Sequence, residues 1–220
     1  MSRDWENGEV TTGPTLFLCL AALMAILDWV AVAKDSAVLE YVSKPSATAA
    51  LLLTAAMLDV SRNASWLWLL AALVLCLAGD VFLMLPRDAF IPGLASFALA
   101  QILFTVSFAT SSVSGGRLVI GLIIAIPASG LLARRFVGAI KKSGHGELVM
   151  PVIVYMVVIS AMAVGSIAAG SAVAVVGAVL FMASDSLIAE SRFVREQRWH
   201  GVGIMVTYHL ALTGLVLGLL

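Results

Sequence analysis

Three aspartates lie inside long apolar segments of the chain, where a carboxyl group is costly and could do chemistry: Asp28, Asp80 and Asp185. A charged side chain at the centre of a membrane-spanning helix costs ~2.5–3.5 kcal/mol on insertion scales, so such a residue usually faces a cavity or a partner. The other ten acidic residues lie in loops or at segment ends, where solvated surface charge explains them. The three aspartates are therefore the first candidates for a functional site.

Asp80 and Asp185 are expected at the same depth, because each lies about one and a half helical turns, or ~8 Å, before the same end of its apolar segment. Two carboxyl groups close together in a dry site cannot both stay ionised, so the pair holds one proton near neutral pH. We predict that the two face one cavity, within about 8 Å of each other, as acid and base. The alternative is that they only pair with Lys44 or cap a helix.

Other polar residues are expected at a similar level and could bind a substrate. Lys44, Tyr155 and Tyr208 lie within about two turns of the same membrane face, and His209 follows Tyr208. Gln101 lies at mid-depth in its apolar segment. His209 is either a satisfied core histidine or a supporting residue.

Two further polar residues have mainly structural interpretations. Asp28 has no comparable motif around it, and we expect it to pair with Lys34 or Lys44. Ser184, like Gly79, precedes one of the paired aspartates and is small, which lets membrane helices approach closely. Ser184 could also support the site.

The composition places these residues in a membrane. Of the 220 residues, 61% are hydrophobic and 12% charged, with a mean hydropathy of +1.06, against roughly 25% charged residues in soluble domains. This excludes a soluble enzyme or a disordered chain, and the net charge of zero gives no footprint for nucleic acid. Cys19 and Cys76 lie in apolar runs, which indicates neither a disulfide framework nor a zinc site.

The expected fold is all-α, a polytopic bundle of eight transmembrane helices in one domain covering residues 1–220. A spanning helix needs about 20 mostly apolar residues. The first twelve residues lack a basic region typical of a signal peptide, so we expect the first span to remain in the mature protein. Only 137–148 is predicted as a long loop. The eight predicted spans are 15–33, 43–59, 65–85, 90–112, 117–136, 149–168, 171–190 and 202–220.

Basic residues predict the orientation, because cytoplasmic loops carry the excess of Lys and Arg. The side that holds the N-terminus has three of them and the other side has ten. We therefore expect both termini outside, the polar level on the cytoplasmic side, and a bacterial inner membrane as the location. The three are Arg3, Arg62 and Arg117; the ten are Lys34, Lys44, Arg87, Arg134, Arg135, Lys141, Lys142, Arg192, Arg195 and Arg198.

A weak internal repeat is consistent with eight spans. The tripeptide ending in Asp185 echoes the one ending in Asp80, 105 residues earlier, and Pro151 echoes Pro45, 106 residues earlier. Two halves of four spans in the same orientation would form a parallel 4+4 repeat; the two matches could also be chance.

The sequence resembles the lysoplasmalogenase family, the YhhN-like eight-span membrane proteins, over nearly its whole length. The resemblance rests on Lys44-Pro45, on GDVFLMLP at 79–86, and on GAVLFMASDSLIAESRF at 177–193, with Tyr155 and Tyr208 fitting the pattern.

The chain departs from the family pattern in two places. Where the family often has F-x-x-A-H-x-x-Y, this chain has Gln101 for the histidine and Phe104 for the tyrosine, and Leu212 stands where a family glutamine is expected. Gln101 can orient a water molecule but cannot titrate.

The resemblance implies hydrolysis of the sn-1 vinyl ether of a lysoplasmalogen-type lysophospholipid to a fatty aldehyde and a glycerophospho-headgroup. Such a reaction needs a general acid and an anion that stabilises an oxocarbenium ion, which Asp80 and Asp185 would supply. Lys44 would bind the phosphate or keep one aspartate ionised; Tyr155, Tyr208 and Gln101 would complete the substrate site. We expect no metal or cofactor, and an inner-leaflet lipid rather than nucleic acid or a protein as the partner.

Two other functions stay open at this stage. An intramembrane aspartyl protease would also use two aspartates on two helices, but the residues before Asp80 are Leu-Ala-Gly rather than Gly-x-Gly. A transporter or binding protein with parallel repeats would need polar groups leading to the outer face, for which Gln101 is the best candidate.

Overall fold

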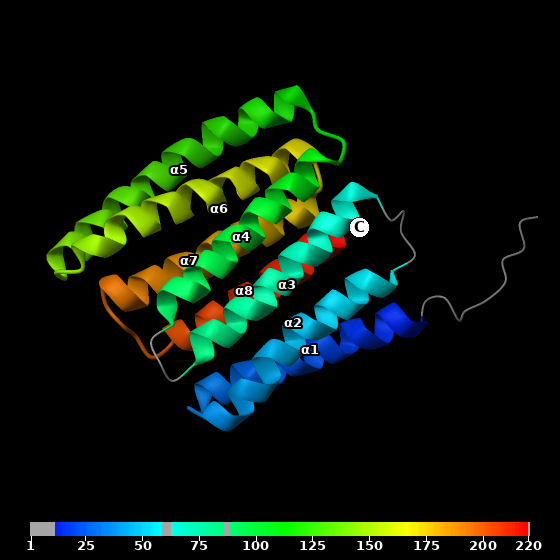
Figure 1. Ribbon diagram of the computed structural model, residues 1–220, viewed down its shortest axis with the longest axis horizontal. Coiled ribbons are helices and arrows are strands. Elements are labelled where there is room, and N and C mark those ends of the chain that lie inside the picture. Colours follow the sequence, from blue (N-terminus) through cyan, green and yellow to red (C-terminus); the bar gives the residue numbers. More distant parts are fainter. Residues whose placement is uncertain (1–11, 59–62, 86–88, 220) are drawn as a thin grey trace, which may run out of the picture.

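The computed structural model describes residues 12–58, 63–85 and 89–219. Within them the chain forms eight α-helices, one short 3₁₀ helix and no strand, which confirms the all-α fold. The helices lie alongside one another in a single bundle (Figure 1). They are α1 (Thr12–Ala33), α2 (Ala37–Met57), α3 (Ala64–Met84), α4 (Phe90–Ala109), α5 (Gly115–Lys142), α6 (Val149–Ala169), α7 (Ala172–Phe193) and α8 (His200–Leu219), with η1 (Gly146–Leu148) before α6.

Seven of the eight described helices are long and apolar enough to cross a membrane, and α2 is the exception. Glu40, Lys44 and several hydroxyl side chains lower its hydropathy. The protein is thus an integral membrane protein, while the eighth span is not confirmed.

The predicted long loop at 137–148 is wrong. Helix α5 continues through Lys142, and η1 follows after only three residues. Residues 137–142 suit a helix end, because Ile140 packs in a small apolar cluster and two lysines occupy the last turn, next to the carbonyl end of the helix dipole. Gly144, with φ of 83°, then provides the left-handed residue at which the chain turns.

The helix that covers the second predicted span begins before that span. Helix α2 begins at Ala37, so Lys44 and Pro45 lie inside the helix rather than at its start. Glu40 interrupts the apolar run at the start of α2, so hydropathy alone does not detect the first six residues of this helix. Pro45 has no N–H to donate to the carbonyl of Tyr41, and such an interruption is tolerated in membrane helices when neighbouring groups compensate. Lys44 is buried as a result of its place within the helix.

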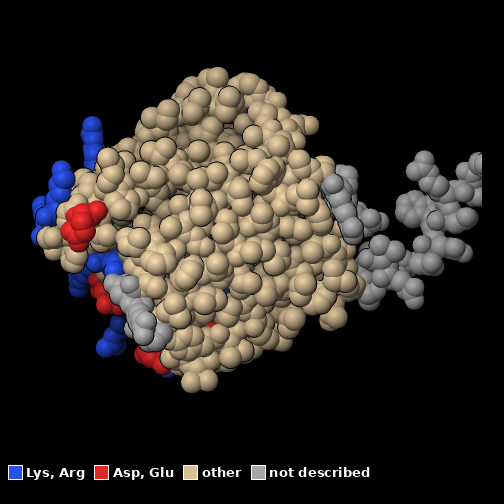
Figure 2. Space-filling model, in the orientation of Figure 1, with Lys and Arg blue, Asp and Glu red and all other residues tan. Residues whose placement is uncertain are grey.

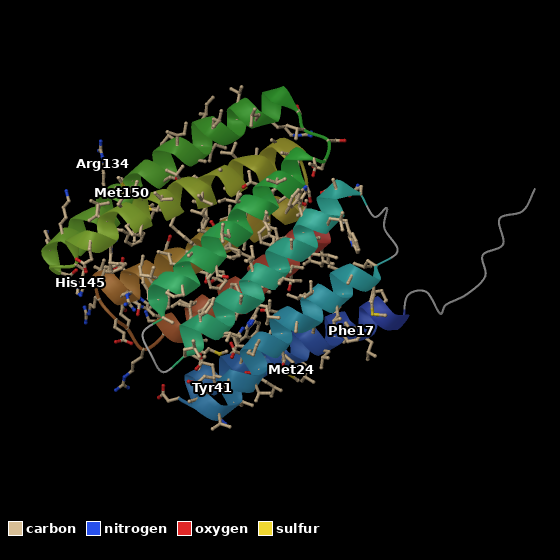
Figure 3. All side chains as sticks on the ribbon, in the orientation of Figure 1. Phe17, Met24, Tyr41, Arg134, His145 and Met150 are labelled. Carbon is tan, nitrogen blue, oxygen red and sulfur yellow. The ribbon has the colours of Figure 1, made fainter. Side chains whose placement is uncertain are left out.

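The charged residues gather at one end of the molecule, the left end in Figure 2. The connections 34–36, 143–148 and 194–199 lie at this end, where α1, α5 and α7 finish (Figure 1). Arg134 and His145 mark it in Figure 3, while Phe17 lies toward the other end. The predicted charge asymmetry therefore has a physical counterpart in the described residues; Arg3, Arg62 and Arg87 lie outside them.

Successive helices pack as antiparallel pairs, and α7 and α8 make the closest approach. A Cβ on Gly177 would lie 2.7 Å from the backbone nitrogen of Leu215, and one on Gly218 would lie 2.3 Å from that of Ala174. Small residues at these crossings let membrane helices pack backbone to backbone. Along one edge of the bundle α5 lies against α6, and α1 and α2 lie along the opposite edge (Figure 1).

Gly177 provides a test of this packing. Gly177→Val should destabilise the detergent-purified protein by about 1–3 kcal/mol, because backbone atoms rather than a movable side chain oppose the new Cβ. Gly138→Val is the matched control, since a Cβ there meets nothing within 4 Å. Thermal unfolding of the two variants should show a large loss only for Gly177→Val, and equal losses would contradict the assigned helix contact.

Candidate functional site

Asp185 is held by two donors from two other helices. The Tyr155 hydroxyl on α6 donates to Asp185 Oδ2 at 2.6 Å, and Gln101 Nε2 on α4 donates to the same oxygen at 3.1 Å. Gln101 Nε2 also donates to the Tyr155 hydroxyl at 2.7 Å. The three side chains form one network in which every donor points toward the carboxyl group. Gln101 is fully buried, and its Oε1 has no partner.

Asp185 and Tyr155 line a cavity between the charged-end halves of α4, α5, α6 and α7. The cavity is mostly apolar, with Phe90, Phe97 and Phe136 in its wall. Its free space of about 70 Å³ is enough for several water molecules, each of which needs roughly 10–15 Å³ by this measure. Both hydrogen bonds described above go to Oδ2, which leaves Oδ1 of Asp185 for a ligand.

Asp80 lies in a second, fully buried cluster. Thr48 Oγ1 on α2 donates to Asp80 Oδ2 at 2.6 Å, and the Tyr208 hydroxyl on α8 donates to it at 3.0 Å. Asp80 Oδ1 is buried without a partner. Lys44, one turn before Thr48 on α2, is within electrostatic range of Asp80.

Lys44 also connects Asp28 and His209 to this cluster, because it is within electrostatic range of both. Asp28 Oδ1 accepts a hydrogen bond from Ser43 at 3.1 Å, and its other oxygen is buried without a partner. His209 Nδ1 accepts from Trp29 Nε1 at 3.1 Å, so the neutral ring carries its proton on Nε2. Of the two partners predicted for Asp28, Lys44 is therefore the one that lies near it.

The two aspartates thus belong to separate networks, and no hydrogen bond joins them in the described part of the chain. Three aromatic rings, Phe97, Phe181 and Tyr208, pack edge to face between the networks, with centroids 5.7–6.2 Å apart. Buried Cys76 is within electrostatic range of both carboxyl groups. Asp80 is not among the residues that line the Asp185 cavity. The predicted common cavity is therefore not seen.

Sequence reasoning missed several contributors. Thr48 carried one signal, its place one turn after Lys44 on the same face of α2. Phe97 stood only as the first residue of the family pattern around Gln101, and the cavity-lining Ser129 and Ser160 gave no signal, because serine is common in membrane helices. Ser184 lies outside both networks: its hydroxyl donates to the carbonyl of Ile204, which ties α7 to α8. No group of three or more potential metal ligands occurs among the described residues.

The partners of the two aspartates correspond across the chain. Asp80 and Asp185 are 105 residues apart. Thr48 and Tyr155 are 107 apart, and Gln101 and Tyr208 are also 107 apart. Each carboxyl group is thus held by one residue from the preceding helix and one from a helix of the other half of the chain.

The fold and these clusters define an all-α integral membrane protein with carboxyl groups buried in its helix bundle. The sequence profile of the YhhN family matches residues 39–219, and the chain belongs to this family.

Relatives with curated names lie in the same family. The chain is 33% identical over 173 residues to proteins named lysoplasmalogenase from Mycobacterium bovis and Mycobacterium tuberculosis, a match that covers 75% of this chain and 65% of each relative. It is 31% identical over 140 residues to the human protein named lysoplasmalogenase TMEM86B, covering 64% of this chain and 58% of the relative. The chain therefore spans less than two thirds of the length of these relatives. No solved structure matches it significantly.

Proposed function

We propose that this protein hydrolyses the vinyl ether bond of lysoplasmalogen-type lysophospholipids. The observation that carries the proposal is the Asp185 carboxyl group, held by Tyr155 and Gln101 at the wall of an apolar cavity inside a membrane protein. The names of the relatives support the substrate class. A lipid is the substrate that an apolar cavity open within the bilayer would receive.

In the first step, Asp185 acts as general acid. Its carboxyl proton passes from Oδ1 to the β-carbon of the vinyl ether, which leaves an oxocarbenium ion and an aspartate carboxylate. Tyr155 and Gln101 donate to Oδ2 and so stabilise that carboxylate as it forms. Gln101 cannot titrate, so its contribution here is to orient Asp185 and Tyr155.

In the second step, a water molecule adds to the oxocarbenium carbon, and the Asp185 carboxylate takes its proton. The product is a hemiacetal, which collapses to a fatty aldehyde and the free glycerol hydroxyl. Asp185 ends protonated, ready for another turnover. We assign to Asp80 the role of a second anion that stabilises the positive charge through the low-dielectric core, where Coulomb interactions are strong.

Two features count against the other functions. Each aspartate has its own donors and neither bonds to the other, whereas an aspartyl protease needs two carboxyl groups that share a proton. Toward the uncharged end, the space between α4, α5 and α6 is lined almost entirely by apolar side chains, and its three hydroxyl groups are bonded within the protein, which disfavours a path for a polar solute.

Asp185→Asn and Asp80→Asn test the proposed roles. Asn keeps the shape but can neither donate a proton to carbon nor carry a negative charge, so each variant should lose vinyl ether hydrolysis by about 10²–10⁴-fold. Aldehyde release from a purified vinyl ether lysolipid is the measurement. If the two act as one unit, the double variant should be scarcely worse than either single variant.

The pattern of losses separates the alternatives. Activity above about a tenth of wild type in Asp185→Asn would remove that residue from the chemistry, since a general acid is worth at least about 10²-fold. If the fold-losses of activity in the two single variants multiply in the double variant, Asp80 acts independently of Asp185, as expected of a purely structural cluster.

Lys44→Met tests whether Lys44 serves the carboxyl cluster or the substrate phosphate. Its burial near Asp80 favours the first role, for which kcat should fall and the pH profile should move while KM changes little. Lys142→Met at the exposed end of α5 is the control for loss of a positive charge. A rise confined to KM would assign Lys44 to phosphate binding, and no change in either parameter would remove it from the site.

We also propose a parallel 4+4 repeat in which α1–α4 correspond to α5–α8 and all eight helices span the membrane. The hydrogen-bond donors of the two aspartates support this repeat. Thr48 and Tyr155, and likewise Gln101 and Tyr208, are 107 residues apart in sequence and hold the two carboxyl groups in equivalent ways. In this arrangement the polar face of α2, with Ser43, Lys44 and Thr48, is buried against the bundle, while apolar side chains such as Val42 and Leu53 are exposed on its outer face.

The charged end is proposed to face the cytoplasm of a bacterial inner membrane, with the chain ends outside. A reporter that fluoresces only in the cytoplasm should be dark when fused after Leu220 and bright when inserted at Gly144, in the turn after α5. The reason is the excess of Lys and Arg at the end where α5 and α7 finish. The reverse pattern of fluorescence would invert the topology and place the Asp185 site in the outer leaflet.

A further inference from the structure

A second cavity lies between α4, α5 and α6 and reaches toward the uncharged end of the bundle. Its free space is about 550 Å³, within the range of roughly 300–1,000 Å³ that small-molecule sites occupy. It exists because α5 packs against α6 but makes almost no contact with α4. Small residues on α6, Ala161, Gly165 and Ala168, keep its floor open.

The wall of this cavity offers a ligand almost nothing but hydrocarbon. Its three hydroxyl side chains are already engaged within the protein. Thr105 Oγ1 donates to the carbonyl of Gln101 at 2.8 Å. Ser129 and Ser160 bond to each other across α5 and α6, and Ser160 also donates to the carbonyl of Met156. An occupant that fits this wall is an unbranched apolar chain without hydrogen-bonding groups.

The apolar cavity adjoins the one that contains Asp185. Ser129, Met156 and Ser160 line both spaces, so the two meet at a common boundary between α5 and α6. From there the apolar cavity extends to Leu118 on α5 and Ala168 on α6. Together the two spaces place the carboxyl group of Asp185 near the charged end and a long apolar arm leading away from it.

The length of the apolar arm suits one lipid chain. Along α5 it runs from Leu118 to Ala133, which is about 22 Å at ~1.5 Å per residue. One leaflet contributes about 15 Å to a hydrocarbon core ~30 Å thick. An extended alkenyl chain therefore fits in the arm with its ether end at the boundary.

We infer that the cavity between α4, α5 and α6 is the binding site for the alkenyl chain of the lysolipid. In this pose the vinyl ether lies beside Asp185 and the terminal methyl group lies near Leu118 and Ala168. The headgroup is left at the charged end. This inference rests on the proposed function, which identifies the bound chain as an alkenyl chain. It adds that the length of the cavity determines which chain lengths bind well.

Ala161→Phe is the first test, because Ala161 is exposed in the wall of the arm and a ring there would block its outer part. For a long-chain vinyl ether lysolipid, KM should rise about tenfold, as expected when a few methylene groups no longer enter. For a homologue with a chain half as long, KM should stay within about twofold. Val154→Phe, on an exposed part of α6 outside the two cavities, is the matched control and should change neither value.

Gly130→Leu provides a second variant if Ala161→Phe fails to fold, since nothing lies within 4 Å of a Cβ at Gly130 and this residue lines the same arm. It should lose the long-chain preference in the same way. An unchanged ratio of long-chain to short-chain KM in a folded variant would overturn the assignment.

Photolabelling separates this inference from the proposed function. The probe is a saturated ether lysolipid, which cannot be hydrolysed, with a diazirine at the chain end. It should label residues near Leu118, Val164 and Ala168, and Ala161→Phe should move the label toward Met156. If these residues are labelled but the wild type releases no aldehyde from a vinyl ether lysolipid, the proposed hydrolysis is refuted and the chain-binding site is retained. Labelling spread uniformly over lipid-facing residues such as Val154 would refute the chain site, whether or not the wild type releases aldehyde.

Discussion

The structure depends on satisfying carboxyl groups inside an apolar bundle. Asp80 is fully buried and Asp185 lies at the wall of a mostly apolar cavity, so each needs hydrogen-bond donors from neighbouring helices. Tyr155 and Gln101 bring α6 and α4 to α7, and Thr48 and Tyr208 bring α2 and α8 to α3. These contacts also fix the rotation of each helix about its axis, because a turned helix would leave a carboxyl group unsatisfied.

The sequence predicted the helices well, since a helix that crosses the bilayer needs about 20 mostly apolar residues. It predicted helix ends poorly, because α5 continues into a polar turn at Lys141 and Lys142 and α2 begins at Ala37, before the predicted span. Depth along a helix says nothing about where that helix stands in the bundle. Asp80 and Asp185 could therefore be placed at one level but not assigned to separate clusters.

Asp185, Tyr155 and Gln101, which hydrogen-bond to one another, were all candidates from the sequence. Thr48, which donates to Asp80, was not. A hydroxyl on a membrane helix often bonds its own backbone, as Thr54 does to the carbonyl of Ala50. Its sequence context does not reveal that it will instead meet a carboxyl group on another helix. The cavities could not be predicted from the sequence either, because they arise where α5 makes almost no contact with α4.

The proposed repeat explains why only one half forms a long lipid site. In the first half, α1 packs against α8, and the corresponding space between α1, α2 and α8 is smaller, about 290 Å³. Trp29 and His209 line that space and hydrogen-bond to each other. In the second half α5 stands clear of α4, and the space stays open from Asp185 outward. Divergence of the edge helices α1 and α5 would thus turn two equivalent carboxyl clusters into one that is closed and charged and one that admits a lipid chain.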